Sequence, residues 1–392
     1  MPSCNHSCVV VTNIPNPYRL HLFRCLHREF LVQGVDFRVL FMAETEPGRF
    51  WELAPGEFGF PFKIARGAHV RLGDAVFHFN PAIICDTLWH RPAWLIVGGS
   101  WAHPTSFGLA GLSRLPPRRS TILFWSEANP SSTRWHSGPV ALLRRRILSC
   151  ADGFVVPGSI AEQTVRSIVP AADKRFLHLP NLVDETLYDS AVAQLRLRRS
   201  ELRAAFGASD RELVLLWPAR LHEPTKGILS FLRTTRNQIT PEVMILLAGE
   251  GPDRAAVEAW LRDHHLPQVK LLGHRSESDM LTLLASADAL ILPSLKDCNP
   301  LVVIEGLWAG LPLLISDRCG NWPEALHPGV NGWLVDPDSP QTVSSAFSSL
   351  LACSRHTLER MGAASRDIAV QRFSSRSCVR AFVTNLIGFQ RC

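Results

Sequence analysis

Residues 289–315 read ALILPSLKDCNPLVVIEGLWAGLPLLI, and this stretch carries one complete strand–helix–strand unit. Residues 289–293 and 313–315 are apolar strand candidates, and residues 301–309 between them form a helix candidate. Continuous apolar strands favour a parallel sheet that is buried on both faces. The stretch therefore predicts an α/β fold in which helices connect parallel strands.

The same alternation extends over nearly the whole chain. Strands are expected at residues 8–14, 36–43, 94–99, 121–126 and 153–157, and again at 213–219, 243–248 and 269–272. Helices are expected at residues 18–30, 140–150 and 160–168, and again at 227–239, 253–265, 279–287 and 374–389. This rhythm is typical of doubly wound sheets, which bind ligands outside the carboxyl ends of their strands.

The length of the chain indicates two domains, because 392 residues are too many for one ordinary core. We predict a Rossmann-like acceptor-side domain over residues 1–188 and a Rossmann-like donor domain over residues 189–373. A C-terminal helix over residues 374–392 is expected to pack back on the first domain. The charged segment 191–206 is expected to be a surface helix that leads into the second domain.

The composition is that of a globular protein, with 46% hydrophobic and 19% charged residues. A net charge of +6 permits an anionic ligand or membrane surface but is too weak to indicate a nucleic-acid-binding protein. We read no spanning helix and no signal peptide, and expect a cytoplasmic location with scope for peripheral contact at the inner face of a membrane. The ten cysteines form no Cys-x-x-Cys pair, and neither a metal nor a cofactor is expected.

Two cations stand at one strand end in the second half. Arg220 ends the strand at 213–219, and Lys226 opens a helix six residues later. A strand end, a helix N-terminus and two cations make a good diphosphate site, although a surface Arg and a surface Lys explain them equally well. Gly249 and Glu250 end the next strand, where glycine permits either close approach to a ligand or a tight turn.

The loop within the opening stretch carries two carboxylates. Asp297 lies in the loop, and Glu305 follows in the helix whose first free amides belong to Leu301 and Val302. Carboxylates accept hydrogen bonds from sugar hydroxyls, so Asp297 could serve a hexose and Glu305 a ribose. The alternative for Glu305 is a buried salt bridge.

These elements together resemble one family. Asp297 and Glu305 have the E-x7-E spacing of retaining GT-B glycosyltransferases, with Asp in the first place. The resemblance covers roughly residues 213–337 in the family's order. It includes Arg220 with Lys226, Gly249-Glu250-Gly251-Pro252, Leu272-Gly273, the loop and helix around Asp297 and Glu305, Asp317-Arg318-Cys319-Gly320-Asn321, Glu324 and Gly329–Val335. The chain resembles glycosyltransferase family 4, which implies two Rossmann-like domains facing a central cleft.

The resemblance implies a role for each matched residue. Arg220 and Lys226 would neutralise the donor diphosphate, Glu305 would bind the ribose, and Asp297 would contact the donor sugar. The remaining donor contacts would come from Asn299, Pro300 and the amides of Leu301 and Val302 at the phosphates, and from Gly249, Glu250, Gly273 and His274 nearer the nucleotide. Aspartate at 297 departs from the family pattern and shortens the reach by one methylene.

Candidates on the acceptor side follow strand ends in the first half. Asn13 and Arg19 lie in a stretch that resembles the opening of a subset of the family, although a helix cap and turn built on Pro17 is the competing interpretation. Glu127 stands where the fold often carries a donor-contacting His, with a solvent-exposed loop carboxylate as the alternative. Gly99 and Ser100 follow a neighbouring strand and are assigned to the acceptor.

Two basic clusters and one acidic string remain. Arg114, Arg118 and Arg119 form one cluster and Arg144, Arg145 and Arg146 another. Each is either a solvated face or a docking site for anionic lipid that brings a lipid-linked acceptor to the enzyme. The string Asp336-Pro337-Asp338 is interpreted as a turn, with no metal implied.

We therefore expect a retaining glycosyltransferase that moves a hexose-type sugar from a nucleotide diphosphate sugar, as co-substrate, to a hydroxyl of a saccharide or lipid-linked acceptor. Bacterial surface polysaccharide or glycolipid assembly is the expected setting. A nucleotide-sugar epimerase on the same fold and a non-catalytic homologue are the alternatives.

Overall fold

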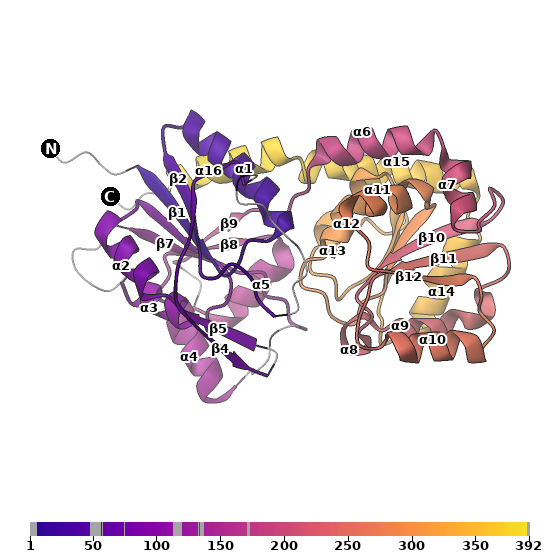
Figure 1. The fold of residues 1–392 in the computed structure, drawn as a ribbon, viewed down its shortest axis with the longest axis horizontal. Helices are drawn as coiled ribbons and strands as arrows, with labels where there is room; N and C mark the ends of the chain where they lie inside the picture. Colours follow the sequence, from indigo (N-terminus) through magenta and orange to yellow (C-terminus); the bar gives the residue numbers. More distant parts are fainter. Residues whose placement is uncertain are drawn as a thin grey trace. The chain divides into compact units, whose positions relative to one another are not determined.

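The computed structural model describes residues 6–47, 56, 58–73, 75–112, 120–131, 133, 137–170 and 173–389. These residues divide into two compact units (Figure 1). The second unit is Val183–Ser374, and the first contains the described residues up to Leu182 together with those from Ser375 onward. Among the described helices, none is both long and apolar enough to cross a bilayer.

The first unit is built on a parallel sheet, in which seven strands fall within the described residues. Its order is β3-β2-β1-β6-β7-β8-β9, so the direction in which strands are added reverses between β1 and β6. The strands are β1 (Ser7–Thr12), β2 (Asp36–Phe41), β3 (Phe62–Ile64), β6 (Trp94–Val97), β7 (Thr121–Trp125), β8 (Gly153–Val156) and β9 (Arg175–His178). Strands β6, β7 and β8 are buried at every position, as a sheet covered on both faces requires.

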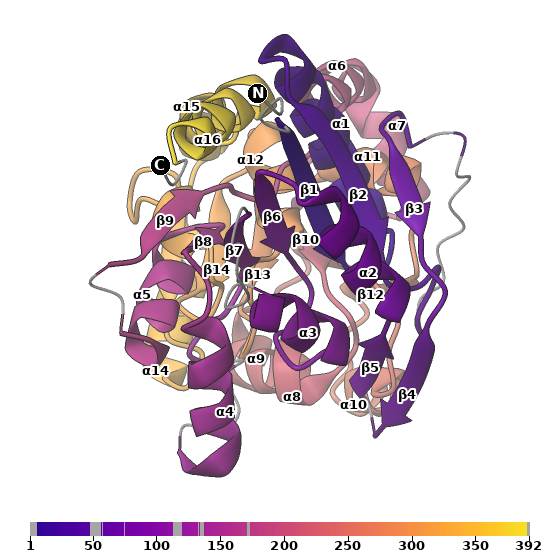
Figure 2. The same ribbon diagram turned by 90° about the vertical axis from the view of Figure 1, so that its left-hand side faces the viewer.

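Helices connect these strands, as Figure 2 shows from the side of the first unit. They are α1 (Pro17–Val32), α2 (Pro81–His90), α3 (Pro104–Leu112), α4 (Gly138–Leu148) and α5 (Ser159–Ile168). The side chain of Asn16 accepts a hydrogen bond from the Tyr18 amide and caps α1, and Pro17 takes the first helical position. The C-terminal helix α16 (Ser375–Ile387) packs against α1.

A short antiparallel hairpin stands apart from the seven-stranded sheet (Figure 2). It consists of β4 (Ala68–Leu72) and β5 (Ala75–Phe79), and His69 lies directly opposite His78 in the register. The sequence did not predict this hairpin. All five positions of β4 are exposed, so no alternation of buried and exposed residues marks the strand.

The second unit holds a parallel sheet of six strands within the described residues, in the order β12-β11-β10-β13-β14-β15. The direction of strand addition reverses between β10 and β13. The strands are β10 (Leu213–Pro218), β11 (Val243–Ala248), β12 (Val269–Gly273), β13 (Ala289–Leu292), β14 (Leu313–Ser316) and β15 (Gly332–Val335). The helices are α6 (Glu185–Arg196), α7 (Arg199–Ala205), α8 (Glu223–Lys226), α9 (Ile228–Thr235), α10 (Arg254–Asp263), α11 (Glu277–Ser286), α12 (Leu301–Trp308), α13 (Trp322–Ala325), α14 (Pro340–Leu351) and α15 (Arg355–Arg372).

The charged segment after the first unit differs from the single surface helix that the sequence suggested. It forms the two helices α6 and α7, and the side chain of Arg203 in α7 is only 1% exposed. Arg203 binds the Asp288 carboxylate at 2.6 Å, and Arg199 binds the same carboxylate at 2.9 Å. Because Asp288 is distant in sequence, the charge pattern alone could not show that this helix is anchored in the unit.

Candidate functional site

The strand order of the second sheet reverses between β10 and β13, and the carboxyl edge at such a reversal is where doubly wound sheets form their ligand crevice. Loops that leave two such strands diverge to opposite faces, and ligands of doubly wound sheets bind between them. Arg220 follows β10, Lys226 ends α8, and Asp297 follows β13. The structure therefore brings the sequence-predicted cations and the loop carboxylate to the same crevice.

Direct contacts join the two loops. The amide of Lys296 donates to the carbonyl of Thr225 at 2.9 Å. The Lys226 ammonium binds the Asp297 carboxylate, and both side chains are largely buried, at 18% and 15% exposed. The carbonyl of Asp297 also accepts a hydrogen bond from the amide of Gly320 at 2.9 Å. Lys226 and Asp297 are thus held in place from both sides of the crevice.

Uncompensated positive charge and free donors lie beside this pair. Arg220 is exposed and has no ion-pair partner among the residues that the structure describes. Helix α12 begins after Pro300, where no side chain caps the helix. The first amides of a helix, here those of Leu301 and Val302, have no acceptor within the helix. The neighbouring Asn299 is half-buried. This combination favours an anion.

Glu305 lies on α12, where it is 5% exposed. Burial raises the pKa of its carboxyl from 4.5 to about 7, and the negative charge of Glu277 acts in the same direction, while a hydrogen bond with Tyr188 opposes the shift. Within the described chain no cation forms an ion pair with Glu305, so its partner is a phenol and not the salt bridge considered from the sequence.

The glycines after β11 have a structural cause. Gly249 has a φ of 151°, and a Cβ there would lie 2.0 Å from the carbonyl oxygen of Ala219. A Cβ at Gly251 would lie 2.2 Å from the carbonyl oxygen of Leu221. The loop after β11 therefore packs tightly against the backbone on both sides of Arg220, so these glycines position the cation.

The predicted nucleotide side of the crevice lies at the ends of β11 and β12. The amide of Gly249 donates to the carbonyl of Gly273 at 2.8 Å, and His274 beyond it is exposed. Glu250 forms an ion pair with Arg254 at 2.6 Å. The structure brings these predicted residues together, and Glu250, in the loop before α10, is paired with the first residue of that helix.

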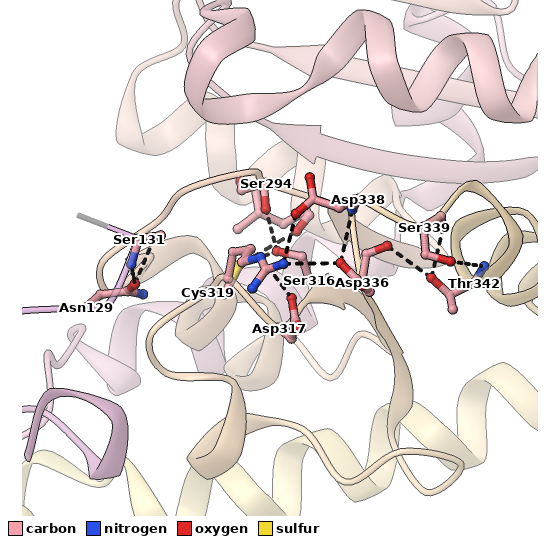
Figure 3. Close-up of polar contacts among 12 residues, drawn as sticks. Asn129, Ser131, Ser294, Ser316, Asp317, Cys319, Asp336, Asp338, Ser339 and Thr342 are labelled. Carbon is pink, nitrogen blue, oxygen red and sulfur yellow. Dashed lines mark hydrogen bonds and ion pairs between the residues drawn. The ribbon is translucent and has the colours of Figure 1, made fainter. Parts of the chain in front are cut away.

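Side chains after β13, β14 and β15 stabilise the same edge of the sheet (Figure 3). The buried hydroxyl of Ser316 donates to the carbonyl of Ser294 at 2.6 Å. Arg318 binds Asp336 at 3.3 Å and Asp338 at 2.9 Å. The two aspartates of the Asp336-Pro337-Asp338 segment are therefore both paired with Arg318. No group of His, Cys, Asp and Glu in the described part of the chain is arranged to hold a metal ion.

The corresponding reversal in the first unit, between β1 and β6, carries the predicted acceptor residues. Asn13 follows β1, and Gly99 and Ser100 follow β6. Gly99 has a φ of 84°, and a Cβ at this position would lie 3.5 Å from the amide nitrogen of Asn13. The side-chain amide of Asn13 donates a hydrogen bond to the Glu46 carboxylate at 2.8 Å. These residues are neighbours at one sheet edge.

Arg19 and Glu127, which the sequence analysis treated separately, form an ion pair at 2.7 Å. Their side chains are 19% and 30% exposed, and the Arg19 guanidinium stacks over the ring of Trp125 at 4.4 Å. The pair joins the start of α1 to the end of β7. Glu127 is therefore partnered, unlike the isolated loop carboxylate considered as its alternative.

A histidine cluster that sequence analysis missed lies at the same edge. We define it as His69, His78 and His103 with Glu46. The His78 side chain is 1% exposed, contacts Glu46 through Nε2 at 2.9 Å, and contacts His69 through Nδ1 at 2.8 Å. His103 Nδ1 accepts from the His78 amide at 3.4 Å, and burial lowers the pKa of His103 to about 4. The cluster ties the hairpin to the sheet.

One of the two basic clusters lies on α4. Arg144 is buried, at 8% exposed, whereas Arg145 and Arg146 are exposed. Leu142 and Leu143 on the same helix are 51% and 46% exposed. The face of α4 that meets solvent is therefore both basic and apolar. The other cluster, Arg114, Arg118 and Arg119, lies outside the described residues.

Comparison with known proteins identifies the family that part of the chain resembles. Residues 198–368 match the family described as glycosyl transferases group 1. This segment, which is less than half of the chain, is similar to the group 1 glycosyltransferases. This match contains Arg220, Lys226, Asp297 and Glu305, and it confirms the family that the sequence motifs predicted.

Curated relatives of the chain are distant and longer than the matched segments. N-acetyl-alpha-D-glucosaminyl L-malate synthase of Bacillus anthracis is 24% identical over 231 residues, which are 58% of this chain and 57% of that protein. D-inositol 3-phosphate glycosyltransferase of Mycobacterium sp. (strain KMS) is 30% identical over 169 residues, 41% of this chain and 37% of that protein. The matched part thus spans about half or less of these relatives.

Solved structures match the chain over almost its full length. HepE of Anabaena, solved with UDP and glucose, has a TM-score of 0.73 at 16% identity and covers 98% of this chain and 100% of its own. Sucrose-phosphate synthase of Thermosynechococcus elongatus has a TM-score of 0.71 at 15% identity, covering 97% and 98%. At such identities the likeness shows the fold, and it confirms the predicted GT-B architecture of two Rossmann-like domains.

Proposed function

We propose that this chain transfers a hexose-type sugar, with retention of configuration, from a nucleotide diphosphate sugar to a hydroxyl acceptor. The observation that carries the proposal is the crevice of the second unit. There Arg220 follows β10, and Lys226 contacts Asp297 in the loop that leads to the uncapped start of α12, the helix that holds Glu305. These groups suit a substrate that joins a diphosphate to a ribose.

The chemistry of the donor follows from the charges. As the bond between sugar and diphosphate breaks, negative charge grows on the leaving phosphate, and preorganised cations and amides there lower the barrier. Arg220, which lacks an ion-pair partner in the described chain, supplies a bidentate donor. Lys226, which binds Asp297, supplies the second charge, and Asp297 is assigned to the hexose hydroxyls.

Glu305 is assigned to the ribose. Its carboxyl is buried and is hydrogen-bonded by Tyr188, so its orientation is fixed before a ligand arrives. The backbone around Gly273 and His274 is assigned to the base. Structural neighbours that were solved with UDP, with UDP-glucose or with UDP and glucose support a nucleotide-sugar donor for this chain.

The acceptor is assigned to the first unit. Asn13, Gly99 and Ser100 lie at its sheet edge, with the Arg19–Glu127 pair anchored by Trp125. Amide, hydroxyl and carboxylate groups of this kind recognise sugar hydroxyls. The relatives named for L-malate and D-inositol 3-phosphate support a hydroxyl acceptor. A saccharide or lipid-linked acceptor in bacterial surface polysaccharide or glycolipid assembly is our proposal, with the departing phosphate assisting deprotonation.

Contact with an anionic membrane is part of the proposal for a lipid-linked acceptor. Helix α4 exposes Leu142 and Leu143 beside Arg145 and Arg146, the pairing of apolar and basic residues that binds anionic interfaces. Binding to phosphatidylglycerol vesicles should fall in the double variant R145Q/R146Q. The matched variant R28Q/R66Q removes two exposed arginines elsewhere in the same unit and should bind as the wild type does. Equal binding by all three proteins would remove the membrane contact from the proposal.

The decisive test of the donor is thermal unfolding with UDP, GDP, ADP, CMP and TDP and their common sugars. A ligand at about 100 times its Kd stabilises the protein by about 2.7 kcal/mol. One nucleotide class should raise the melting temperature, and Glu305→Ala should abolish the rise. The absence of any nucleotide-dependent shift would contradict the proposed donor site.

Turnover separates the two alternative functions. A nucleotide-sugar epimerase would convert the donor without an acceptor, and a non-catalytic homologue would bind the nucleotide without consuming the donor. We expect donor consumption that requires an added acceptor extract. Lys226 paired with Asp297, next to Arg220, supports transfer over either alternative.

A further inference from the structure

A second charged cavity lies in the second unit, outside the crevice just described. It has a volume of about 440 Å³ and is lined by residues of α6 and α15, and by the C-terminal end of α12 and the loop that follows it. Helix α12 packs against both α6 and α15 (Figure 1). The cavity is lined by Arg196, Arg199, Arg355 and Arg366, together with Tyr188 and Trp308.

The carboxylates of this cavity leave part of its positive charge without a partner. Asp288 is shared by Arg199 and the buried Arg203, and Asp189 is bound by Arg366 at 2.6 Å. Glu359 also lines the cavity and is exposed. Arg196 and Arg355 form no ion pair with a carboxylate among the described residues.

Arg196 and Arg355 instead donate to carbonyl oxygens. The Arg196 guanidinium donates to the carbonyl of Ala309 at 2.6 Å, and the Arg355 guanidinium donates to the carbonyl of Asp210. Carbonyls solvate a guanidinium but do not neutralise its charge. The two arginines therefore stay positively charged beside a cavity of molecular size.

The guanidinium groups also repel one another. The positive charge of Arg199, after burial itself, lowers the pKa of Arg196. The charges of Arg203 and Arg355 likewise add to burial in lowering the pKa of Arg199, against the opposing effect of Asp288. An anion placed among these groups would relieve this repulsion.

Unused hydrogen-bond donors point to the same ligand chemistry. The Nε atoms of Arg196, Arg199 and Arg366 and the indole nitrogen of Trp308 are buried and have no acceptor among the residues that the structure describes. All four are donors, and all four belong to residues that line the cavity. Buried polar groups normally have partners, so these four donors leave room for a ligand that brings acceptors. A phosphate group brings several strong acceptors at once.

We propose that this cavity binds a phosphorylated small molecule, with Arg196 and Arg355 as its main charge partners and Trp308 and Tyr188 as its apolar contacts. The volume lies within the range of small-molecule sites, roughly 300 to 1,000 Å³. The site is separate from the donor crevice, since neither Arg220 nor Lys226 lines it.

The cavity shares structural parts with the donor crevice. Tyr188 lines the cavity and also hydrogen-bonds Glu305. Arg196 and Arg366 donate to the carbonyls of Ala309 and Trp308 at the C-terminal end of α12, the helix that carries Glu305. A ligand that draws on these arginines therefore acts on α12, and occupancy of the two sites should be linked.

Calorimetry with inorganic pyrophosphate tests the site. The background is the double variant R220A/K226A, in which the diphosphate groups of the donor crevice are removed, so binding there is independent of the proposed donor site. We expect one pyrophosphate per chain, with affinity reduced at least tenfold by the further changes R196Q and R355Q. Arg360, exposed on the same helix α15 but outside the cavity, supplies the control R360Q, which should bind unchanged.

Two results would overturn the proposal. One is the absence of pyrophosphate binding in R220A/K226A while the protein remains folded by thermal unfolding. The other is unchanged affinity in R355Q, a variant of an exposed residue that is expected to fold. Failure here would leave the donor site intact, because that site is tested by nucleotides and by Glu305→Ala.

Hydrogen exchange tests the link between the sites. Pyrophosphate should slow amide exchange in α6, in the last turn of α12 and in the first turns of α15 of R220A/K226A. Slower exchange confined to residues 220–226 and 297–302 would place the anion in the donor crevice and overturn the assignment. Exchange in α12 that does not respond to bound pyrophosphate would overturn the link to Glu305.

Discussion

The two sheets reverse their strand order at equivalent places, between β1 and β6 in the first unit and between β10 and β13 in the second. The side chains at these two edges differ. In the second unit, Arg220 has no ion-pair partner among the described residues, and α12 begins without a capping side chain. In the first unit, Arg19 is bound by Glu127 and Asn13 by Glu46.

In the proposed function, this difference explains how the same topology can bind a donor in one unit and an acceptor in the other. The topology determines where a ligand meets each sheet, whereas the balance of charge determines what kind of ligand it is. An arginine without an ion-pair partner and helix-start amides without a capping side chain suit the diphosphate of a donor. Carboxylates, an amide and imidazoles that already form a hydrogen-bonded chain suit the hydroxyls of an acceptor and offer no net positive site to a phosphate.

The largest expected effect is in the second unit. Lys226→Ala should lower kcat about 10²- to 10³-fold, because the charge that meets the leaving phosphate is lost and Asp297 loses its partner. Lys270→Ala removes an exposed lysine of the same unit and should have little effect. The kcat of both variants is measured as the rate of sugar transfer from the identified donor.

Arg19→Ala provides the comparison in the first unit. It should act mainly on the KM for the acceptor, because Arg19 is already neutralised by Glu127. A loss of kcat in Arg19→Ala as large as that in Lys226→Ala would show that the two edges do not divide the substrates as proposed.

The second prediction concerns the pH dependence of stability. Burial raises the pKa of Glu305 to about 7 from an ordinary value of 4.5, so the folded state holds a proton that the unfolded state releases. The free energy of unfolding should therefore fall as pH rises from about 4.5 to 7, by about 3 kcal/mol at 1.36 kcal/mol per pKa unit.

Glu305→Gln cannot ionise and should lack this loss of stability. Chemical denaturation between pH 5 and pH 8 measures the free energy of unfolding of both proteins. The stability of the variant relative to the wild type should increase as pH rises. A difference that stays constant over this range would mean that the Glu305 pKa is not raised. This effect belongs to the second unit, where Glu305 lies on α12.

The third prediction concerns the histidine cluster. Glu46→Ala should lower the free energy of unfolding by about 1–3 kcal/mol, because the buried Nε2 of His78 and the amide of Asn13 each lose an acceptor. Glu44→Ala removes an exposed carboxylate two residues away and should change it by less than about 0.5 kcal/mol. Equal effects in urea denaturation would show that the chain at the acceptor edge has no structural role.

Much of the fold was predictable, because its strands are buried on both faces. The strand expected at residues 243–248 coincides with β11, and every residue of that strand is buried. Apolar runs of this kind reveal a strand without knowledge of its neighbours. The residues of the donor crevice were predictable for a related reason, since they follow such strands at short, ordered spacings.

The remaining features depend on partners that are far apart in sequence. The exposed strand β4 has no apolar pattern, so the pairing of His69 with His78 could not be anticipated. From the sequence Arg203 is expected at the surface, and only its ion pair with Asp288 in the structure explains why it is buried. Tyr188 lies 117 positions before Glu305, and no local signal connects them. Burial of a charged or polar group becomes visible only with its partner.

The smallest expected effect concerns the departure at position 297. Asp297→Glu adds one methylene between a backbone fixed by the Gly320 amide and a carboxylate bound by Lys226. The longer side chain moves its carboxylate towards the hexose or shifts the lysine, and neither change removes a charge. We expect kcat/KM for the donor to change by less than about tenfold, or 1.4 kcal/mol, in either direction. A fall as large as that of Lys226→Ala would show instead that the length of this ion pair sets the rate, and that the donor edge depends on geometry as strictly as on charge.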